Sequence, residues 1–179
     1  MSASFDRALT IVLGHEGGFD SGREDPGNWT GGHVGAGELR GTKYGISAAS
    51  YPNLNIESLT PAAAASIYRE RYWDSISGDH LPPPLALLVF DAAVNNGVGR
   101  AAGWLQQTLG VTPDGQIGPA TLAALEHAAV TQGGAFLCSE FQARRMVFMA
   151  SLATWPTFGV GWSRRLCALP YQSLTMGAP

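Results

Sequence analysis

Hydrophobic residues recur every three or four positions along most of the chain, which is the periodicity of amphipathic helices. Near the N-terminus this pattern predicts a first helix over residues 5–13, which Ser2 or Ser4 can cap. Thr60-Pro61 has the composition of a helix start. The stretch LALLVFDAAVNNG at residues 85–97 is apolar on nearly every side, so we expect it to be the buried central helix. Further helices are expected at residues 99–109, 120–129 and 135–153, with a short closing segment at 158–169.

The stretch from Gly14 to Ile46 interrupts this helical pattern. It holds eleven of the 23 glycines, and its short β-capable pieces lie between Gly-Gly and Gly-x-Gly turns. We therefore predict a mainly α protein with a small, irregular β-hairpin or loop region after the first helix.

Composition limits the class of protein. Hydrophobic residues make up 45% and charged residues 14% of the 179 positions, which excludes a disordered chain. The formal net charge is -3, although residues 127–179 carry four arginines against one glutamate. This basic end is too small to indicate nucleic-acid binding, so we expect no nucleic-acid partner. The two cysteines, Cys138 and Cys167, occur in apolar helical contexts and are expected to be buried free thiols.

The N-terminal segment does not have the pattern of a secretory signal peptide, because Asp6 precedes a short, amphipathic apolar run. No run approaches the roughly 20 apolar residues that a membrane span needs. We therefore expect synthesis in a cytoplasm and no stable insertion into a membrane. The chain is also expected to be a monomer.

Glu16 is the first candidate for chemistry. It lies in or just after the last turn of the predicted first helix, where the helix dipole disfavours a negative charge. Partial burial there would raise the pKa of its carboxyl group, as a general acid requires. Asp25 can remain ionised opposite it, and Thr42 offers a hydroxyl that can position a water. Asp25 can equally be a turn residue before Pro26, and Asp20 and Glu24 are interpreted as solvated loop charges.

An ordered series of motifs accompanies these residues. They are Glu16-Gly17-Gly18-Phe19, Asp25-Pro26-Gly27, Gly41-Thr42-Lys43-Tyr44-Gly45-Ile46, Tyr72-Trp73-Asp74, Phe90-Asp91 with Asn95, Gln106, Asp114-Gly115 with Ile117-Gly118-Pro119, and Gly161-Trp162-Ser163-Arg164-Arg165. In this series the chain resembles the N-acetylmuramidases of glycoside hydrolase family 108, found in phage endolysins and bacterial secretion-activator proteins. The resemblance covers most of the chain.

The resemblance implies a lysozyme-like, two-lobed helical fold and cleavage of the β-1,4 bond after N-acetylmuramic acid, with Glu16 as the catalytic acid. Residues 1–97 would form the catalytic segment, and residues 98–179 a helical, peptidoglycan-associated segment packed with it. By similarity to phage-type lysozymes, Asp25 and Thr42 would hold the attacking water. The chain departs from the family pattern by an insertion at about residues 29–40, so Thr30 is the alternative to Thr42.

Four other residues are candidates for substrate binding. Tyr44 and Trp73 can stack on sugar rings or pack inside the protein. Asp91 and Asn95 share a helix face and either line the substrate groove or bond to buried backbone. The four histidines show no metal-ligand spacing, so neither a metal nor another cofactor is expected.

Three functions remain open from the sequence. The first is a muramidase of the phage-endolysin type that lyses bacteria by degrading peptidoglycan glycan strands in the periplasm or outside the membrane. The second is a lytic transglycosylase that uses the same acid but needs no positioned water. The third is a cell-wall-binding protein without catalytic activity, with the DGQIGPATL stretch at residues 114–122 as part of the binding module.

Overall fold

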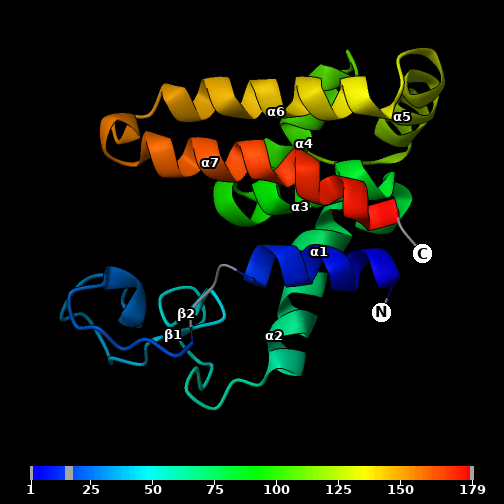
Figure 1. The fold of residues 1–179 in the computed structure, drawn as a ribbon. Coiled ribbons are helices and arrows are strands. Elements are labelled where there is room, and N and C mark those ends of the chain that lie inside the picture. The colour runs from blue at the N-terminus through cyan, green and yellow to red at the C-terminus, as the bar shows by residue number, and fades with distance from the viewer. Residues whose placement is uncertain (1, 15–17, 178–179) are drawn as a thin grey trace. The chain divides into compact units, whose positions relative to one another are not determined.

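The computed structural model describes residues 2–14 and 18–177 and is mainly α-helical (Figure 1). Its α-helices are α1 Ala3–Leu13, α2 Pro61–Tyr68, α3 Pro83–Asn96, α4 Val98–Thr108, α5 Pro119–Thr131, α6 Gly134–Ala150 and α7 Trp155–Ser173. Short helical turns are η1 Pro26–Asn28, η2 Arg69–Trp73, η3 Asp74–Ile76, η4 Gly78–His80 and η5 Leu174–Gly177. Strands β1 Thr42–Lys43 and β2 Ile46–Ser47 form a two-stranded antiparallel sheet. The predicted mainly α fold with a small β region after the first helix is confirmed.

The chain divides into two compact units. Residues 9–68 form one unit, which contains the glycine-rich stretch, the sheet and α2. Residues 1–8 and 69–179 form the other, so the smaller unit is inserted between two parts of the larger one. The two sequence segments of the larger unit are held together by contacts such as the hydrogen bond from Arg7 Nη1 to the carbonyl of Thr175 (2.7 Å).

Helix α3 is the centre of the larger unit. Nine of its residues, from Leu85 to Ala93, are buried, which confirms the prediction of a buried central helix. Helices α4, α6 and α7 pack against it, and α6 and α7 run side by side (Figure 1). Burial of apolar side chains on all sides of one helix gives this unit its hydrophobic core.

An aromatic cluster joins α1 to this core. The rings of Phe5, Trp73 and Phe90 meet edge to face, with centroid distances of 5.4 to 6.0 Å. The start of α1 is fixed by Ser2, whose Oγ accepts a hydrogen bond from the backbone N–H of Phe5 (3.4 Å), as expected for an N-cap residue.

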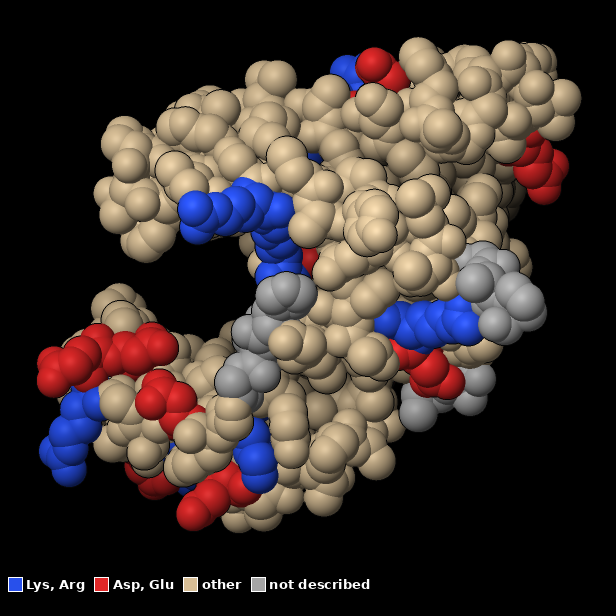
Figure 2. All heavy atoms as spheres, viewed as in Figure 1, with Lys and Arg blue, Asp and Glu red and all other residues tan. Residues whose placement is uncertain are grey.

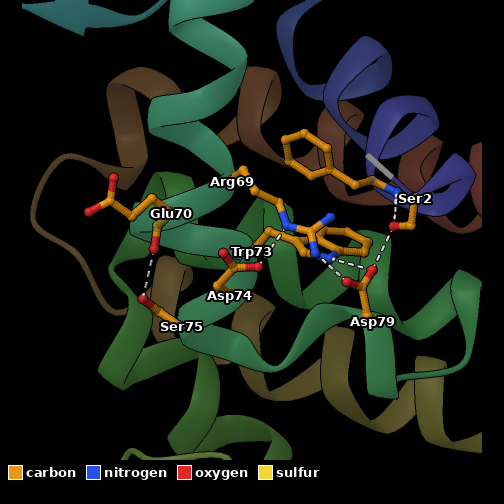
Figure 3. A network of polar contacts seen from close by, with 8 residues as sticks. Ser2, Arg69, Glu70, Trp73, Asp74, Ser75 and Asp79 are labelled. Carbon is orange, nitrogen blue, oxygen red and sulfur yellow. Dashed lines mark hydrogen bonds and ion pairs between the residues drawn. The ribbon is translucent and has the colours of Figure 1, made fainter.

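A polar network lies beside Trp73 of the aromatic cluster (Figure 3). Asp79 Oδ1 accepts hydrogen bonds from Ser2 Oγ (2.6 Å) and from Trp73 Nε1 (3.0 Å). The guanidinium group of Arg69 pairs with Asp79 and with Asp74, and it lies over the ring of Phe5 at 5.3 Å. Ser2 and Phe5 precede the inserted unit and Arg69 follows it, so the network joins the two parts of the larger unit.

Helix α7 is longer than the closing segment predicted at residues 158–169. Pro156 fits the first turn of the helix, where its missing N–H costs nothing. Pro170 lies inside the helix and cannot donate to the carbonyl of Leu166. The side chain of Gln142 on α6 donates to that carbonyl instead (3.0 Å). A partner from a neighbouring helix therefore lets α7 continue through a proline, which local sequence does not reveal.

The DGQIGP turn at residues 114–119 is fixed by Gln106, which is 1% exposed. Its amide nitrogen donates to Asp114 Oδ1 (2.6 Å) and to the carbonyl of Gln116 (2.9 Å), and its oxygen accepts from Gly115 N (2.9 Å). These bonds assign Gln106 and Asp114 a structural role. The hydrogen bond from Gln106 holds the pKa of Asp114 below its ordinary value.

Charged side chains gather over the smaller unit on the face shown in Figure 2, whereas the surface of α6 and α7 is mostly uncharged there. In the described part of the chain, no helix is long and apolar enough to cross a membrane. Both cysteines are free. Cys138 is partly buried, which raises the pKa of its thiol to about 11, and Cys167 is exposed, contrary to the expectation that both would be buried.

Candidate functional site

Glu16, the predicted catalytic acid, lies outside the described residues. Helix α1 ends at Leu13, and the backbone N–H of Gly14 still bonds to the carbonyl of Thr10 (2.8 Å). The chain is described again from Gly18. The other predicted catalytic residues belong to the smaller unit, which presents them on an irregular, glycine-rich backbone.

Three polar side chains form a row across the small sheet. Asp20 and Thr42 exchange two backbone hydrogen bonds, both 2.8 Å long. Thr42 also pairs with Ser47 on the neighbouring strand. Residues directly opposite each other in antiparallel strands project from the same face. The side chains of Asp20, Thr42 and Ser47 therefore project from the same face of the sheet.

Asp25 lies near the Ser47 end of this row. A Cβ atom placed on Gly27 would be 3.1 Å from Asp25 Oδ1 and 3.7 Å from the Cβ of Ser47. Asp25 Oδ1 accepts a hydrogen bond from Gly27 N (2.8 Å) and caps η1, as predicted for a turn residue. Among the described residues, no donor bonds to its Oδ2, so this oxygen is open to water.

Asp20 is held more firmly than a solvated loop charge. Its Oδ2 accepts from the side-chain amide of Asn28 (2.9 Å), and its Oδ1 accepts from Gly22 N (3.2 Å). Asn28 is completely buried, and its carbonyl accepts from the backbone N–H groups of Arg40 and Gly41. Asn28 thus fixes Asp20 beside Thr42, whereas the sequence interpretation gave Asp20 no specific position.

The insertion at residues 29–40 folds back on itself. Trp29 and Leu39 form an isolated β-bridge, and the backbone N–H of Thr30 bonds to the carbonyl of Glu38 (2.9 Å). The hydroxyl of Thr30 accepts a hydrogen bond from the backbone N–H of Glu38 (2.9 Å). The Thr30 side chain therefore helps to close this loop, whereas the Thr42 side chain belongs to the polar row.

Tyr44 has an unusual backbone conformation. Tyr44 and Gly45 connect β1 to β2 with φ angles of 51° and 71°, as in the two-residue turns that close tight hairpins. A bulky residue at positive φ is uncommon and is strained relative to glycine or asparagine. The hydroxyl of Tyr68 donates to the carbonyl of Tyr44 (2.9 Å) and stabilises the turn. The Tyr44 side chain itself is partly exposed.

Two of the predicted substrate-binding residues are buried in the larger unit. Trp73 is 0% exposed, and its ring packs against Phe5 and Phe90. This position is incompatible with stacking on a sugar, because the ring has no surface to offer. Asp91 is also 0% exposed, and its carboxylate accepts hydrogen bonds from Arg145 and Arg165. It cannot contact substrate directly either.

Asn95, the fourth of these residues, is exposed at the end of α3. Its amide nitrogen donates to the carbonyl of Asp91 (2.8 Å), and its side chain lines a small cavity. Within residues 2–14 and 18–177, no group of three or more His, Cys, Asp or Glu side chains could hold a metal ion.

Sequence reasoning missed Asp20 and Ser47. Recognition of Tyr44-Gly45 as a two-residue hairpin turn would have paired Thr42 with Ser47. The bridge between Asp20 and Thr42 had no such local signal, because it joins segments that are separated by the insertion. Asp20, Thr42 and Ser47 thus share one face of the sheet, and Asp25 lies near Ser47. Carboxylates and hydroxyl groups of this kind can orient water or bind sugar hydroxyl groups.

Two family models match consecutive parts of the chain. The model described as Glycosyl hydrolase 108 matches residues 9–97, and the model described as Predicted Peptidoglycan domain matches residues 100–167. Among solved structures, the chain is similar to SagA from Brucella abortus, with 30% sequence identity and a TM-score of 0.78. The match covers 98% of this chain and 96% of that chain. No curated protein matches the chain significantly.

Proposed function

This chain belongs to the glycosyl hydrolase 108 family, and from this we propose that it cleaves the β-1,4 bond between N-acetylmuramic acid and N-acetylglucosamine. The segment that follows the hydrolase segment matches a peptidoglycan domain. The chain is therefore a glycoside hydrolase that acts on peptidoglycan, in the bacterial cell wall. The bond that it cleaves and the residues that carry the reaction are the proposal.

We assign Glu16 as the general acid that protonates the leaving oxygen. Glycoside hydrolysis needs such an acid and a second group that activates water or stabilises the developing cation. In this proposal Asp25 and Thr42 hold the water that attacks the sugar. The observation that supports this assignment is the free Oδ2 of Asp25, close to the row of Asp20, Thr42 and Ser47.

Glu16→Gln tests the acid. The amide has nearly the same shape but cannot donate the proton, so release of reducing ends from purified sacculi should fall by roughly 100-fold to 10,000-fold. Far-ultraviolet circular dichroism should be unchanged. Near-normal release by a folded Glu16→Gln variant would refute the assignment of the acid.

Asp25→Ala and Asp20→Ala separate the two carboxylates. If Asp25 holds the water, its replacement should reduce hydrolysis about 100-fold. Asp20 is already bonded by Asn28 and Gly22, so its replacement should act through the position of Thr42 and have a smaller effect. The opposite order of effects would transfer the water-holding role to Asp20.

We further propose that this activity makes the protein bacteriolytic, as in release of phage from a host cell. The purified protein should clear a suspension of bacteria whose outer membrane has been permeabilised. A transglycosylase would also clear the suspension, but it would tolerate Asp25→Ala. A wall-binding protein without activity would sediment with sacculi and release no reducing ends.

A further inference from the structure

A small cavity lies at the end of α3, between α3, α6 and α7 of the larger unit. Its volume is about 160 Å³. The polar side chains that line it are those of Asn95, Asn96, Arg145 and Arg165, and the indole of Trp162 lines it as well. Most of these residues fall within residues 100–167, the segment matched by the peptidoglycan domain. The reaction proposed above does not use this cavity.

The cavity carries an excess of positive charge. Arg145 Nη1 lies 2.7 Å from Asp91 Oδ2, and Arg165 Nη2 lies 2.5 Å from Asp91 Oδ1. Two guanidinium groups thus share one carboxylate, which leaves a net charge of about one unit. No acidic residue follows Glu140 in the sequence, and Glu140 pairs with Arg144. The carbonyl end of α3 offsets part of this charge but not all of it.

The two guanidinium groups also retain unused donors. Arg145 bonds through Nη1 and Nε to Asp91 and Asn96, and Arg165 bonds through Nε and Nη2 to Asp91. In the described part of the chain, Arg145 Nη2 and Arg165 Nη1 have no acceptor. Burial, together with the neighbouring charge of Arg165, lowers the pKa of Arg145. An anion in the cavity would relieve this repulsion and satisfy the free N–H groups.

Trp162 is the aromatic residue that lines this cavity, and two further aromatic rings contact it. The ring of Trp162 lies 6.0 Å from that of Trp155 and 5.8 Å from that of Phe158. Phe158 is 53% exposed. An aromatic side chain beside amide and guanidinium donors suits a ligand that combines a sugar or peptide with a carboxylate.

We propose that this cavity binds a free carboxylate of the peptide stems of peptidoglycan, with Arg165 and Arg145 as donors and Trp162 against the adjoining sugar or peptide. This inference rests on peptidoglycan being the substrate, and it gives the second half of the chain a specific contact with it. Arg165 makes the main contact with the ligand because its side chain is 25% exposed. The side chain of Arg145 is 1% exposed and donates from the buried end of the cavity.

Titration of the full-length Glu16→Gln protein with muramyl dipeptide is the direct test. This compound carries a free carboxylate, and the same compound with that group amidated is the matched control. Binding to the cavity should shift the indole N–H resonance of Trp162 in a nuclear magnetic resonance spectrum. The amidated compound should bind roughly tenfold more weakly, the loss expected without a charge-assisted pair. Equal binding of the two compounds would overturn the proposal.

Two variants that each remove one positive charge complete the test. Arg165→Gln should weaken binding of muramyl dipeptide and of intact sacculi roughly tenfold. Arg164→Gln removes the same charge from the next residue, which is exposed and makes no ion pair among the described residues, and should leave binding nearly unchanged. Equal effects of both variants would mean nonspecific attraction. Tighter binding of glycerol 3-phosphate than of muramyl dipeptide would assign the cavity to a phosphate polymer instead.

Reducing-end release by the unmodified protein is measured in parallel. If it is absent, the proposed function fails. A second outcome is that the unmodified protein releases reducing ends, but muramyl dipeptide binds equally well to the Arg165→Gln and Glu16→Gln proteins. In that case the inference about the cavity fails and the proposed function stands. The titration uses the native arginines, so it decides the question even if Arg165→Gln does not fold.

Discussion

At the scale of single residues, Tyr44 combines backbone strain with a partly exposed aromatic ring. Its positive φ occurs in a turn where asparagine or glycine would be more stable. Strain of this kind is concentrated at active sites and ligand-binding positions. We infer that the Tyr44 ring contacts the glycan.

Tyr44→Asn should therefore raise stability and lower activity together. The strain relieved is about 1 kcal/mol, which would appear as a higher midpoint in urea denaturation. The loss of the ring should raise the KM for sacculi. Tyr44→Phe keeps both the ring and the strain, so it should change neither quantity. A Tyr44→Asn variant with unchanged KM would show that the ring does not contact substrate.

The burial of Trp73 and Asp91 could not be predicted from the sequence. Their place in motifs makes Trp73 and Asp91 candidates for substrate binding, with packing or a structural role as the alternative. Their burial depends on partners that are distant in sequence, namely Phe5 for Trp73 and Arg145 and Arg165 for Asp91. A motif identifies such residues as important, but it does not distinguish a core position from a groove.

At the scale of elements, the helices were predictable where their signals are local. Apolar periodicity and the Thr60-Pro61 start identified α1, α2 and α3, and the buried centre of α3 followed from its composition. The length of α7 was not predictable, because its continuation through Pro170 depends on Gln142 of another helix.

Gln142→Ala tests this dependence. The variant leaves the carbonyl of Leu166 without a partner in a buried position, which should cost about 1–3 kcal/mol in the free energy of unfolding. Pro170→Ala restores a backbone N–H that can donate to the same carbonyl. In a double-mutant cycle followed by urea denaturation, Gln142→Ala should therefore cost about 1 kcal/mol less in the Pro170→Ala background. An equal cost in both backgrounds would contradict this role for Gln142.

At the scale of the whole molecule, residues 9–68 form a unit inserted into the larger one. The lysozyme-like, mainly helical fold follows from the order of motifs along the chain. The division into a larger, discontinuous unit and an inserted one does not follow from the motifs, because it depends on contacts between residues 2–8 and residues beyond 69. The network around Asp79 supplies some of these contacts (Figure 3).

Asp79→Asn should destabilise the protein at pH 7 by about 1 kcal/mol, a modest value because the carboxyl group is partly exposed. Hydrogen bonds from Ser2 and Trp73 and the charge of Arg69 lower the pKa of Asp79 below its ordinary value of 3.8. Its stabilising effect is therefore present above pH 3.8 and is lost as the pH falls through the lowered pKa. Urea denaturation should show a large difference between variant and parent at pH 7 and a smaller one below pH 3.

Ser75→Ala is the matched control. Among the described residues, the Ser75 hydroxyl makes one hydrogen bond, a long one of 3.5 Å to the carbonyl of Glu70 in the same region. It should change stability little at any pH. A destabilisation by Asp79→Asn that does not vary with pH would show that the carboxylate charge does not contribute.

The central claim, that this family member is a muramidase using Glu16 as its acid and a positioned water, is tested most directly by mass spectrometry of the products released from sacculi. The unmodified protein is predicted to release muropeptides that end in a reducing N-acetylmuramic acid, the product of hydrolysis. These products should be absent with Glu16→Gln. Products with a 1,6-anhydro end, lighter by one water, would identify a transglycosylase. Products with N-acetylglucosamine at the reducing end would contradict the assigned bond.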